Sequence, residues 1–207
     1  MENSAEHIYA CFDGILGRAE KERMLKQHAR VVWLTGLSGS GKSTIARLLE
    51  KALAGKGFFT QVLDGDNIRS GINNNLGFSD KERMENIRRI SEVSKLFLNC
   101  GIICINSFIS PTEAIRKMAS DIIGPENLIL VHVDASLATC EQRDTKGLYK
   151  KARKGEIKDF TGIDSVYEKP ENPDITLNTE RLSAEESVEI VLQRLLPIIT
   201  YSEKPNA

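Results

Sequence analysis

Short apolar runs of strand length recur along the chain and are separated by longer amphipathic segments. The first run occupies residues 30–35, others lie at 58–63, 101–106 and 128–133, and 175–177 is a last short one. Unbroken apolar runs of this length are typical of parallel strands that are covered on both faces. The pattern therefore predicts a sheet of short, buried strands.

The segments between these runs show helical spacing. Glycines at 55 and 57 end a first helix, and Ser79 with Glu82 forms a capping box that opens another. The apolar stripe of the first helix comprises Ile45, Leu48, Leu49, Ala52 and Leu53. Because strands alternate with helices, we predict an α/β fold with a parallel sheet flanked by helices on both faces. Ligands of such sheets bind beyond the carboxyl ends of the strands.

The length and composition of the chain fit one domain. With 207 residues, 41% hydrophobic and 28% charged, the chain suits a single compact α/β unit. We predict an arm over 1–28, the domain over 29–200 and a frayed tail over 201–207. A basic flap lies at about 143–165, and its low apolar periodicity predicts a mobile segment rather than a core element. Its basic residues are Lys146, Lys150, Lys151, Arg153, Lys154 and Lys158.

The charge balance and the leader segment limit the partners of the chain. Its 28 Lys and Arg residues nearly match 29 Asp and Glu residues, so attraction for anions must arise locally and nonspecific nucleic-acid binding is not expected. The polar segment 1–26 resembles neither a signal peptide nor a transit peptide, and no run is long enough to cross a bilayer. We therefore predict a cytoplasmic protein without a membrane partner.

A phosphate-binding motif follows the first predicted strand directly. Residues 36–43 read GLSGSGKS and match the P-loop pattern GxxxxGK[ST] between a strand and a helix. Backbone N–H groups of such a loop surround a phosphate, and the helix N-terminus adds positive charge. Lys42 can reach the terminal phosphates of ATP, and Ser43 offers a hydroxyl ligand to Mg²⁺. The predicted nucleotide-binding residues are Gly36, Leu37, Ser38, Gly39, Ser40, Gly41, Lys42, Ser43 and Thr44.

A second group of charged residues follows the second predicted strand, which we expect beside the P-loop strand. Residues 63–69 read LDGDNIR and carry two carboxylates and a guanidinium. One carboxylate can hold a water of the Mg²⁺ ion while the other accepts a proton from an attacking hydroxyl, and Arg69 can pair with an anionic substrate group. We favour Asp66 as the proton acceptor and Asp64 for the metal's water shell, and the reverse assignment stays open.

The next predicted helix adds two polar candidates. Arg83 and Asn86 lie three residues apart, so they share one face near its N-terminal end. Phe78 and Phe160 stand on loops, where two aromatic rings can clasp a planar base. The alternatives stay open that Arg83 and Asn86 are solvated surface residues and that either phenylalanine is a capping staple or a core residue.

Several stretches of the chain resemble the adenylylsulfate kinases. They include the P-loop segment 33–44, LDGDNIR at 63–69, ENIRRI at 85–90, FISP at 108–111 and KGLYKKAR at 146–153. LGFS at 76–79, CEQRD at 140–144, FTGID at 160–164 and residues 167–173 are also similar. The resemblance implies a P-loop kinase fold. It also implies transfer of the ATP γ-phosphoryl group to the 3′-hydroxyl of adenosine 5′-phosphosulfate, which gives 3′-phosphoadenosine 5′-phosphosulfate and ADP in sulfate assimilation.

The resemblance also implies roles for single residues. Lys42, Asp66 and Ser110 would be catalytic, with Ser110 as an active-site phosphoserine, although in-line transfer needs no covalent intermediate and a substrate contact is an equal alternative. Arg143 would contact the ATP adenine, and two phenylalanines would stack on the substrate adenine. The implied substrate-binding residues are Asp66, Asn67, Arg69, Phe78, Arg83, Asn86, Ile109, Ser110, Lys146 and Phe160.

Three positions depart from the family pattern. Thr112 and Glu113 stand where an aromatic residue or His and then an Arg are common, and Asn74 stands where a basic residue is frequent. Less positive charge there would weaken binding of an anionic substrate. Two other functions stay open, namely a P-loop kinase for a nucleoside monophosphate or a sugar acid, and a catalytically silent nucleotide-binding domain. Family members are commonly dimers, which implies a homodimer, and a separate ATP sulfurylase would supply the substrate.

Overall fold

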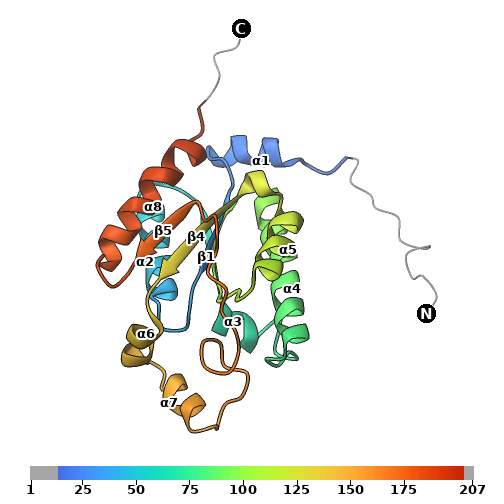
Figure 1. Cartoon of the computed structure of the whole chain (residues 1–207). Coiled ribbons are helices and arrows are strands. Elements are labelled where there is room, and N and C mark those ends of the chain that lie inside the picture. Colours follow the sequence, from blue (N-terminus) through green and yellow to red (C-terminus); the bar gives the residue numbers. More distant parts are fainter. Residues whose placement is uncertain (1–13, 203–207) are drawn as a thin grey trace, which may run out of the picture.

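A five-stranded parallel sheet lies at the centre of the protein, and helices cover both of its faces (Figure 1). The computed structural model describes residues 14–202, so the parts of the predicted arm and tail at 1–13 and 203–207 lie outside the described residues. The strands are β1 (Val31–Thr35), β2 (Thr60–Asp64), β3 (Ile103–Ser107), β4 (Leu128–Asp134) and β5 (Ile175–Asn178). Each overlaps a predicted apolar run, and the predicted α/β fold is confirmed.

The helices form two layers. In chain order the helices are α1 (Arg18–Leu25), α2 (Lys42–Ala54), α3 (Gly65–Ser70), α4 (Asp80–Asn99), α5 (Glu113–Ile123), the 3₁₀ helix η2 (Pro125–Asn127), α6 (Leu137–Arg143), α7 (Leu148–Arg153) and α8 (Ala184–Ile199). Figure 1 shows α2 and α8 on one face of the sheet and α4 and α5 on the other. Side chains of β1 alternate between these layers. Val32 and Leu34 pack with α2 and α8, whereas Val31 and Trp33 pack with α4 and α5.

The strand order corrects one expectation from the sequence. The order is β2-β3-β1-β4-β5, so β3 separates β2 from the P-loop strand β1 instead of β2 lying beside it. The burial of the two strands gives the reason. All five residues of β3 are buried, whereas β2 reads TQVLD and exposes Gln61, which suits a strand at the edge of a sheet. All four pairings are parallel, so the carboxyl ends of the strands meet at one edge.

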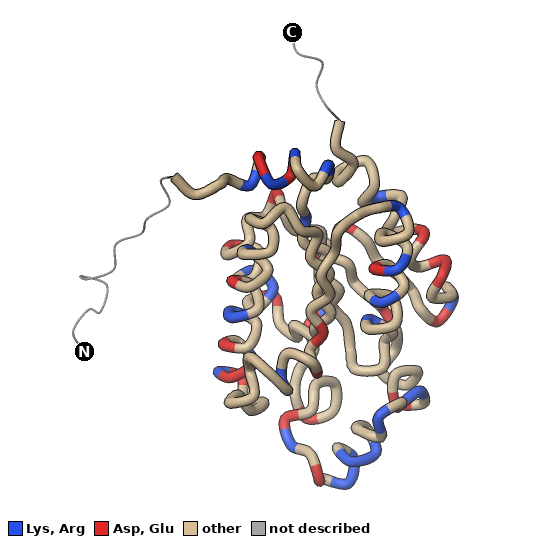
Figure 2. Tube along the Cα trace, turned by 180° about the vertical axis from the view of Figure 1, so that it is seen from behind, with Lys and Arg blue, Asp and Glu red and all other residues tan. Residues whose placement is uncertain are grey.

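The basic flap contains more fixed structure than the sequence predicted. It includes α7, and Tyr149 on this helix is 1% exposed and packs with Leu37 and Cys140. The Tyr149 hydroxyl donates to the carbonyl of Ser38 in the P-loop at 2.9 Å. Figure 2 shows Lys and Arg gathered along the flap at one end of the molecule. The flap therefore combines a cationic outer side with an aromatic anchor.

Polar contacts attach α1 and the residues that follow it to the opposite end of the sheet. Arg18 donates to the carbonyl of Ala29 at 2.8 Å, and the Gln27 side chain donates to the carbonyls of Phe59 and Gly101 at 2.9 and 2.7 Å. These bonds satisfy backbone groups where β2 and β3 begin. Within residues 14–202, every helix is too short or too polar to cross a membrane.

Candidate active site

A cavity of about 1060 Å³ opens at the carboxyl ends of the strands. The P-loop and α3 line one part of it, and residues 107–111 after β3, the start of α4 and the flap line the rest. We name residues 108–111 the acceptor loop. The volume is at the upper end of the usual range for small-molecule pockets, which fits room for two nucleotides.

The P-loop has the backbone shape that a phosphate cradle needs. Gly41 caps α2 with φ +107°, a left-handed conformation that other residues adopt only under strain. A Cβ atom on Gly36 would stand 2.5 Å from the carbonyl oxygen of Val133, so only glycine fits there. The N-terminus of α2 then faces the cavity with unpaired N–H groups.

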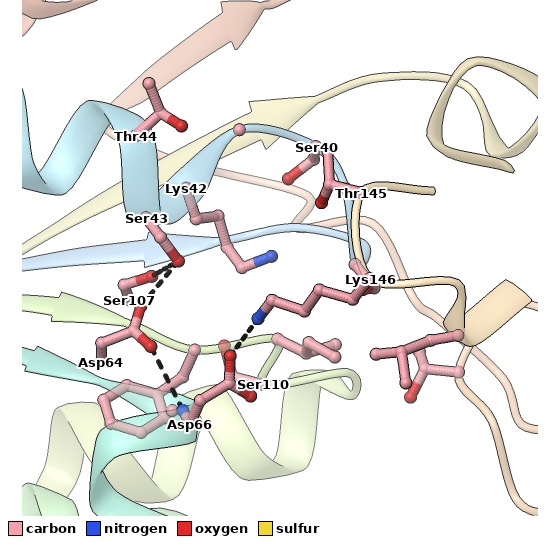
Figure 3. A pocket seen from close by; sticks show the side chains of 18 of the residues that line it. Ser40, Lys42, Ser43, Thr44, Asp64, Asp66, Ser107, Ser110, Thr145 and Lys146 are labelled. Atoms are coloured by element: carbon pink, nitrogen blue, oxygen red, sulfur yellow. Dashed lines mark hydrogen bonds and ion pairs between the residues drawn. The ribbon is translucent and has the colours of Figure 1, made fainter. Parts of the chain in front are cut away.

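Lys42 projects from the first turn of α2 into the cavity (Figure 3). Its ammonium group donates to the carbonyls of Gly36 and Leu37 at 2.9 and 2.7 Å. Burial lowers the pKa of Lys42 to about 8, because the charged form loses its hydration. A bound polyphosphate would restore a counter-charge next to this lysine.

Ser43 and Asp64 form a pair that suits Mg²⁺. The Ser43 hydroxyl donates to an Asp64 carboxylate oxygen at 2.6 Å, and the Ser107 hydroxyl lies 3.4 Å from Ser43 (Figure 3). Among residues 14–202 no group of three His, Cys, Asp or Glu side chains gathers to hold a metal ion. One hydroxyl and one carboxylate are the donors expected where Mg²⁺ takes its other ligands from phosphates and water. The residues present therefore fit a phosphate-bound Mg²⁺ ion.

Asp66 faces the cavity from the start of α3. Its backbone N–H donates to Asp64 at 3.2 Å, so Asp64 caps the helix that carries it. The Asp66 carboxylate forms an ion pair with the ammonium group of Lys146 from the flap (Figure 3). Both side chains are more than half exposed, at 67% and 54%, so water weakens the attraction.

Phe78 packs against two guanidinium groups. Arg69 lies 4.4 Å and Arg83 5.9 Å from the centre of its ring. Arg69 also donates to the carbonyls of Leu76 and Gly77 at 3.2 and 2.8 Å. These contacts hold an aromatic ring that is 55% exposed beside the cavity.

Arg83 connects α4 with the flap. It donates to the Thr161 hydroxyl at 2.7 Å, to the Phe78 carbonyl at 2.7 Å and to the Asp159 carbonyl. Phe160, between the two flap residues, packs edge-on against Tyr149 with ring centres 5.0 Å apart. The second predicted aromatic ring thus also lines the cavity.

The two asparagines of the predicted set differ in their surroundings. Asn86 is buried on α4, and its side-chain oxygen accepts from Asn73 at 2.9 Å. Asn67 lies on α3 and is exposed at the cavity. Together with the residues above, they stand around the same space as the P-loop.

Ser110 of the acceptor loop is buried at 2% exposure. Its hydroxyl donates to the Thr35 hydroxyl at 2.9 Å and accepts from the Trp33 ring nitrogen at 3.1 Å. The neighbouring Ile109 lines the cavity. The hydroxyl on which a phosphoserine role depends is thus already engaged on both sides.

Arg143 lies at the end of α6 next to the P-loop. It donates to the Gly39 carbonyl at 3.3 Å and to the Thr179 carbonyl at 2.6 Å. The Thr179 hydroxyl donates in turn to the Ser40 carbonyl at 2.9 Å. These bonds connect the end of β5 with the loop that binds phosphate.

Sequence reasoning missed several residues that line the cavity. Ser107 and Thr179 stand at the ends of β3 and β5, where the rule of carboxyl strand ends would have found them. Tyr149 and Thr161 of the flap gave no such signal, because no regular pattern surrounds them. The missed residues that line the cavity include Ser107, Thr145, Tyr149, Thr161 and Thr179.

The family model described as adenylylsulphate kinase matches residues 28–178. The chain belongs to the adenylylsulphate kinase family. An adenylyl-sulfate kinase of Bacteroides thetaiotaomicron is 58% identical over 193 residues, which cover 93% of this chain and 96% of that protein. Another, from Clostridium acetobutylicum, is 53% identical over 178 residues and covers 86% of this chain and 88% of that protein.

A solved adenylylsulphate kinase has a similar fold. The APS kinase of Mycobacterium tuberculosis in complex with AMPPNP and APS is 46% identical, with a TM-score of 0.79, over 82% of this chain and 98% of that one. The likeness covers most of both chains. This chain thus shares its overall fold with that enzyme.

Proposed function

We propose that this chain is an adenylyl-sulfate kinase that transfers the ATP γ-phosphoryl group to the 3′-hydroxyl of adenosine 5′-phosphosulfate. The products are 3′-phosphoadenosine 5′-phosphosulfate and ADP, in sulfate assimilation. The observation that carries this proposal is that one cavity is shared by the P-loop, with Lys42 and Ser43, and a facing set of acidic, cationic and aromatic side chains. Family membership over residues 28–178 supports the choice of acceptor.

The donor nucleotide would lie on the P-loop. Backbone N–H groups at the start of α2 bind its phosphates, and Lys42 orients the terminal ones. Arg143, beside Gly39 and Thr179, would contact the adenine. Ser43 would be a ligand of Mg²⁺ and Asp64 would hold its water shell, and the ion, when bound, would supply neutralisation of the phosphate charge.

The acceptor nucleotide would lie between α3, α4 and the flap. Phe78 and Phe160 would stack on its adenine, and Arg69, Arg83 and Lys146 would bind the phosphosulfate group. Asn67, Asn86, Ile109 and Ser110 complete the proposed substrate-binding set.

Asp66 would orient the 3′-hydroxyl and accept its proton. It stands on the same side of the cavity as Asp64 and Ser43, the proposed metal residues, so a hydroxyl beside it can face the terminal phosphate (Figure 3). An exposed carboxylate changes partners readily, so the acceptor hydroxyl can replace Lys146. Transfer is then direct and in line, and positioning with charge neutralisation supplies most of the rate. Ser110 would contribute as part of the acceptor loop rather than as a phosphorylated intermediate.

An acceptor panel tests the proposal. The protein is incubated with ATP and Mg²⁺ and with adenosine 5′-phosphosulfate, AMP or gluconate in turn, and ADP and the phosphorylated product are measured. We expect product from adenosine 5′-phosphosulfate alone. Product from AMP or gluconate would identify a different small-molecule kinase, and no turnover with any acceptor would identify a silent nucleotide-binding domain.

Three further expectations accompany the proposed activity. The enzyme would act in the cytoplasm, where ATP is available, and its substrate would come from a separate ATP sulfurylase. It would act as a homodimer, which the mass in solution tests directly. A monomer mass at working concentration would contradict the dimer without affecting the proposed reaction.

A further inference from the structure

We propose that Thr35, the last residue of β1, is a positioning residue that fixes the acceptor loop relative to the P-loop. The inference rests on the proposed function, because it concerns how the two substrates of that reaction are aligned. Thr35 directly precedes Gly36, the first residue of the P-loop. The Thr35 side chain, however, points to the acceptor loop, where its hydroxyl donates to the Ile109 carbonyl.

Three side chains and one carbonyl form a continuous chain of hydrogen bonds. The Trp33 ring N–H donates to the Ser110 hydroxyl at 3.1 Å, which donates to the Thr35 hydroxyl at 2.9 Å. The Thr35 hydroxyl then donates to the Ile109 carbonyl at 2.7 Å. The Trp33 N–H can only donate and a backbone carbonyl can only accept, so the Thr35 hydroxyl accepts from Ser110 and donates to Ile109. The Ser110 carbonyl is a second, more distant acceptor for Thr35 at 3.5 Å. Trp33, Thr35 and Ser110 are all at most 2% exposed, so water cannot replace these bonds.

Strand geometry explains why Thr35 serves this purpose. Side chains alternate along a strand, so Trp33 and Thr35 point to the same face of the sheet. The backbone pairing of β1 with β3 ends where the Phe108 N–H donates to the Leu34 carbonyl at 3.1 Å. Beyond that point, the Thr35 hydroxyl continues the connection into the acceptor loop. A side-chain hydrogen bond from Thr35 thus takes the place of the next backbone hydrogen bond between β1 and the chain that follows β3.

The acceptor loop needs such support because its backbone is strained. Ser110 has φ +38°, which is a left-handed backbone conformation. This conformation is unfavourable for any residue other than glycine. Arg116, whose side chain is 2% exposed, donates to the Ser110 carbonyl at 2.9 Å. The contacts of Thr35 and Arg116 together maintain a conformation that the loop alone would leave.

The position of Ile109 explains how the hydrogen bond from Thr35 would affect the reaction. Ile109 lines the cavity on the side of the acceptor, and its carbonyl is the group that Thr35 holds. A shift of this loop moves the acceptor hydroxyl away from the phosphoryl group, and misplacement by about 1 Å lowers a rate about 100-fold. The P-loop contacts to ATP would remain, because they come from backbone groups after Gly36.

Two substitutions of Thr35 isolate the hydroxyl. Thr35→Val keeps the shape of the side chain and removes the hydrogen bonds, whereas Thr35→Ser keeps the hydroxyl and removes a methyl group. For Thr35→Val we expect kcat/KM for adenosine 5′-phosphosulfate to fall about 10- to 100-fold while the Kd for ATP stays unchanged. Thr35→Ser should restore most of the activity. Equal activity of Thr35→Val and the native protein, or an equal loss in Thr35→Ser, would overturn the proposal.

The fluorescence of Trp33 gives a second readout that needs no turnover. Trp33 is the single tryptophan of the chain, and its ring N–H is the first donor of the hydrogen-bond chain. We expect Thr35→Val and Ser110→Ala to shift its emission in the same direction, and Thr35→Ser to keep the native spectrum. Melting temperatures and circular dichroism of each variant check that it folds.

The two readouts separate the two proposals. If the native protein phosphorylates no adenosine 5′-phosphosulfate, the proposed function fails, while the emission shifts still test the Thr35 connection. If Thr35→Val retains the native emission spectrum, or loses ATP binding in parallel with activity, Thr35 does not position the acceptor loop.

Discussion

Asp66 and Lys146 meet across the cavity in an ion pair, although 80 residues separate them in sequence. Asp66 follows β2 at the start of α3, whereas Lys146 begins the KGLYKKAR stretch of the flap. The pair joins the proposed proton acceptor to the segment that would close over the substrates. In the proposed reaction, binding of the acceptor would exchange this contact for one with the substrate, and the Lys146 ammonium group would become available for the phosphosulfate group.

Asp66→Asn tests the role of the carboxylate. We expect kcat to fall about 10²- to 10⁴-fold, the usual contribution of a general base, with little change in the Kd for ATP. Steady-state kinetics and nucleotide-binding titrations measure the two quantities. Near-native turnover would remove Asp66 from the mechanism. Asp64→Asn serves as the comparison, and we expect its main effect on the Mg²⁺ concentration needed for half-maximal rate.

We expect nucleotide binding to depend on pH through Lys42. Burial lowers the pKa of Lys42 to about 8, so in the free protein this lysine is mostly neutral above that pH, and a bound polyphosphate would raise the pKa. Below about pH 8 the lysine is charged with and without ATP, so its affinity contribution is constant. Above it, binding takes up a proton, and the affinity for ATP falls by at most about tenfold per pH unit.

Titration of ATP at several pH values between 7 and 9.5 measures this decline. Lys42→Arg provides the control, because arginine stays protonated throughout. The affinity of this variant for ATP should stay constant over the same pH range, even if it is lower than that of the native protein. An equally steep decline in the variant would assign the pH dependence to another group.

Arg83→Lys tests the connection between α4 and the flap. Lysine cannot reproduce the forked contacts to Thr161 and the Asp159 carbonyl, so we expect a higher KM for adenosine 5′-phosphosulfate and faster trypsin cleavage within 150–158. Arg88→Lys is the matched control on the same helix, because Arg88 pairs with Glu85 at the surface, away from the flap. Equal cleavage rates in both variants would show that Arg83 does not restrain the flap.

Gly36→Ala tests the close approach behind the P-loop. The added methyl group would meet the Val133 carbonyl at 2.5 Å, so either the loop or β4 must move. We expect loss of ATP binding and a fall in the free energy of unfolding of about 1–3 kcal/mol. Gly55→Ala is the control at the end of α2, where φ is −63° and the nearest contact is 3.4 Å. That variant should match the native protein in thermal unfolding and ATP titration.

The sequence predicted the elements that depend on local pattern. The strands were recognised because burial on both faces leaves continuous apolar runs, and the P-loop because its chemistry lies within eight neighbouring residues. The strand order was wrong, since the position of β2 at an edge depends on pairings with distant segments. For the same reason the burial of Ser110 was not foreseen, because its hydroxyl is engaged by Thr35 and Trp33 from 75 or more residues earlier.

The flap was only partly predictable. Its charge was plain from the composition, but α7 has too few apolar residues to show a helical period. This helix is anchored by contacts of Tyr149 with distant residues, namely its hydrogen bond to the Ser38 carbonyl and its packing against Leu37. Such contacts leave no trace in the local sequence.

The place of β5 at one edge of the sheet has a consequence for synthesis of the chain. The hydroxyl of Thr179, which follows β5, donates to the Ser40 carbonyl and accepts from Arg143. A growing polypeptide that has left the ribosome only as far as α7 contains every P-loop residue but lacks Thr179, β5 and α8. The hydrogen bonds between Thr179, Arg143 and the Ser40 carbonyl therefore form only after β5 has been synthesised and has docked on the sheet.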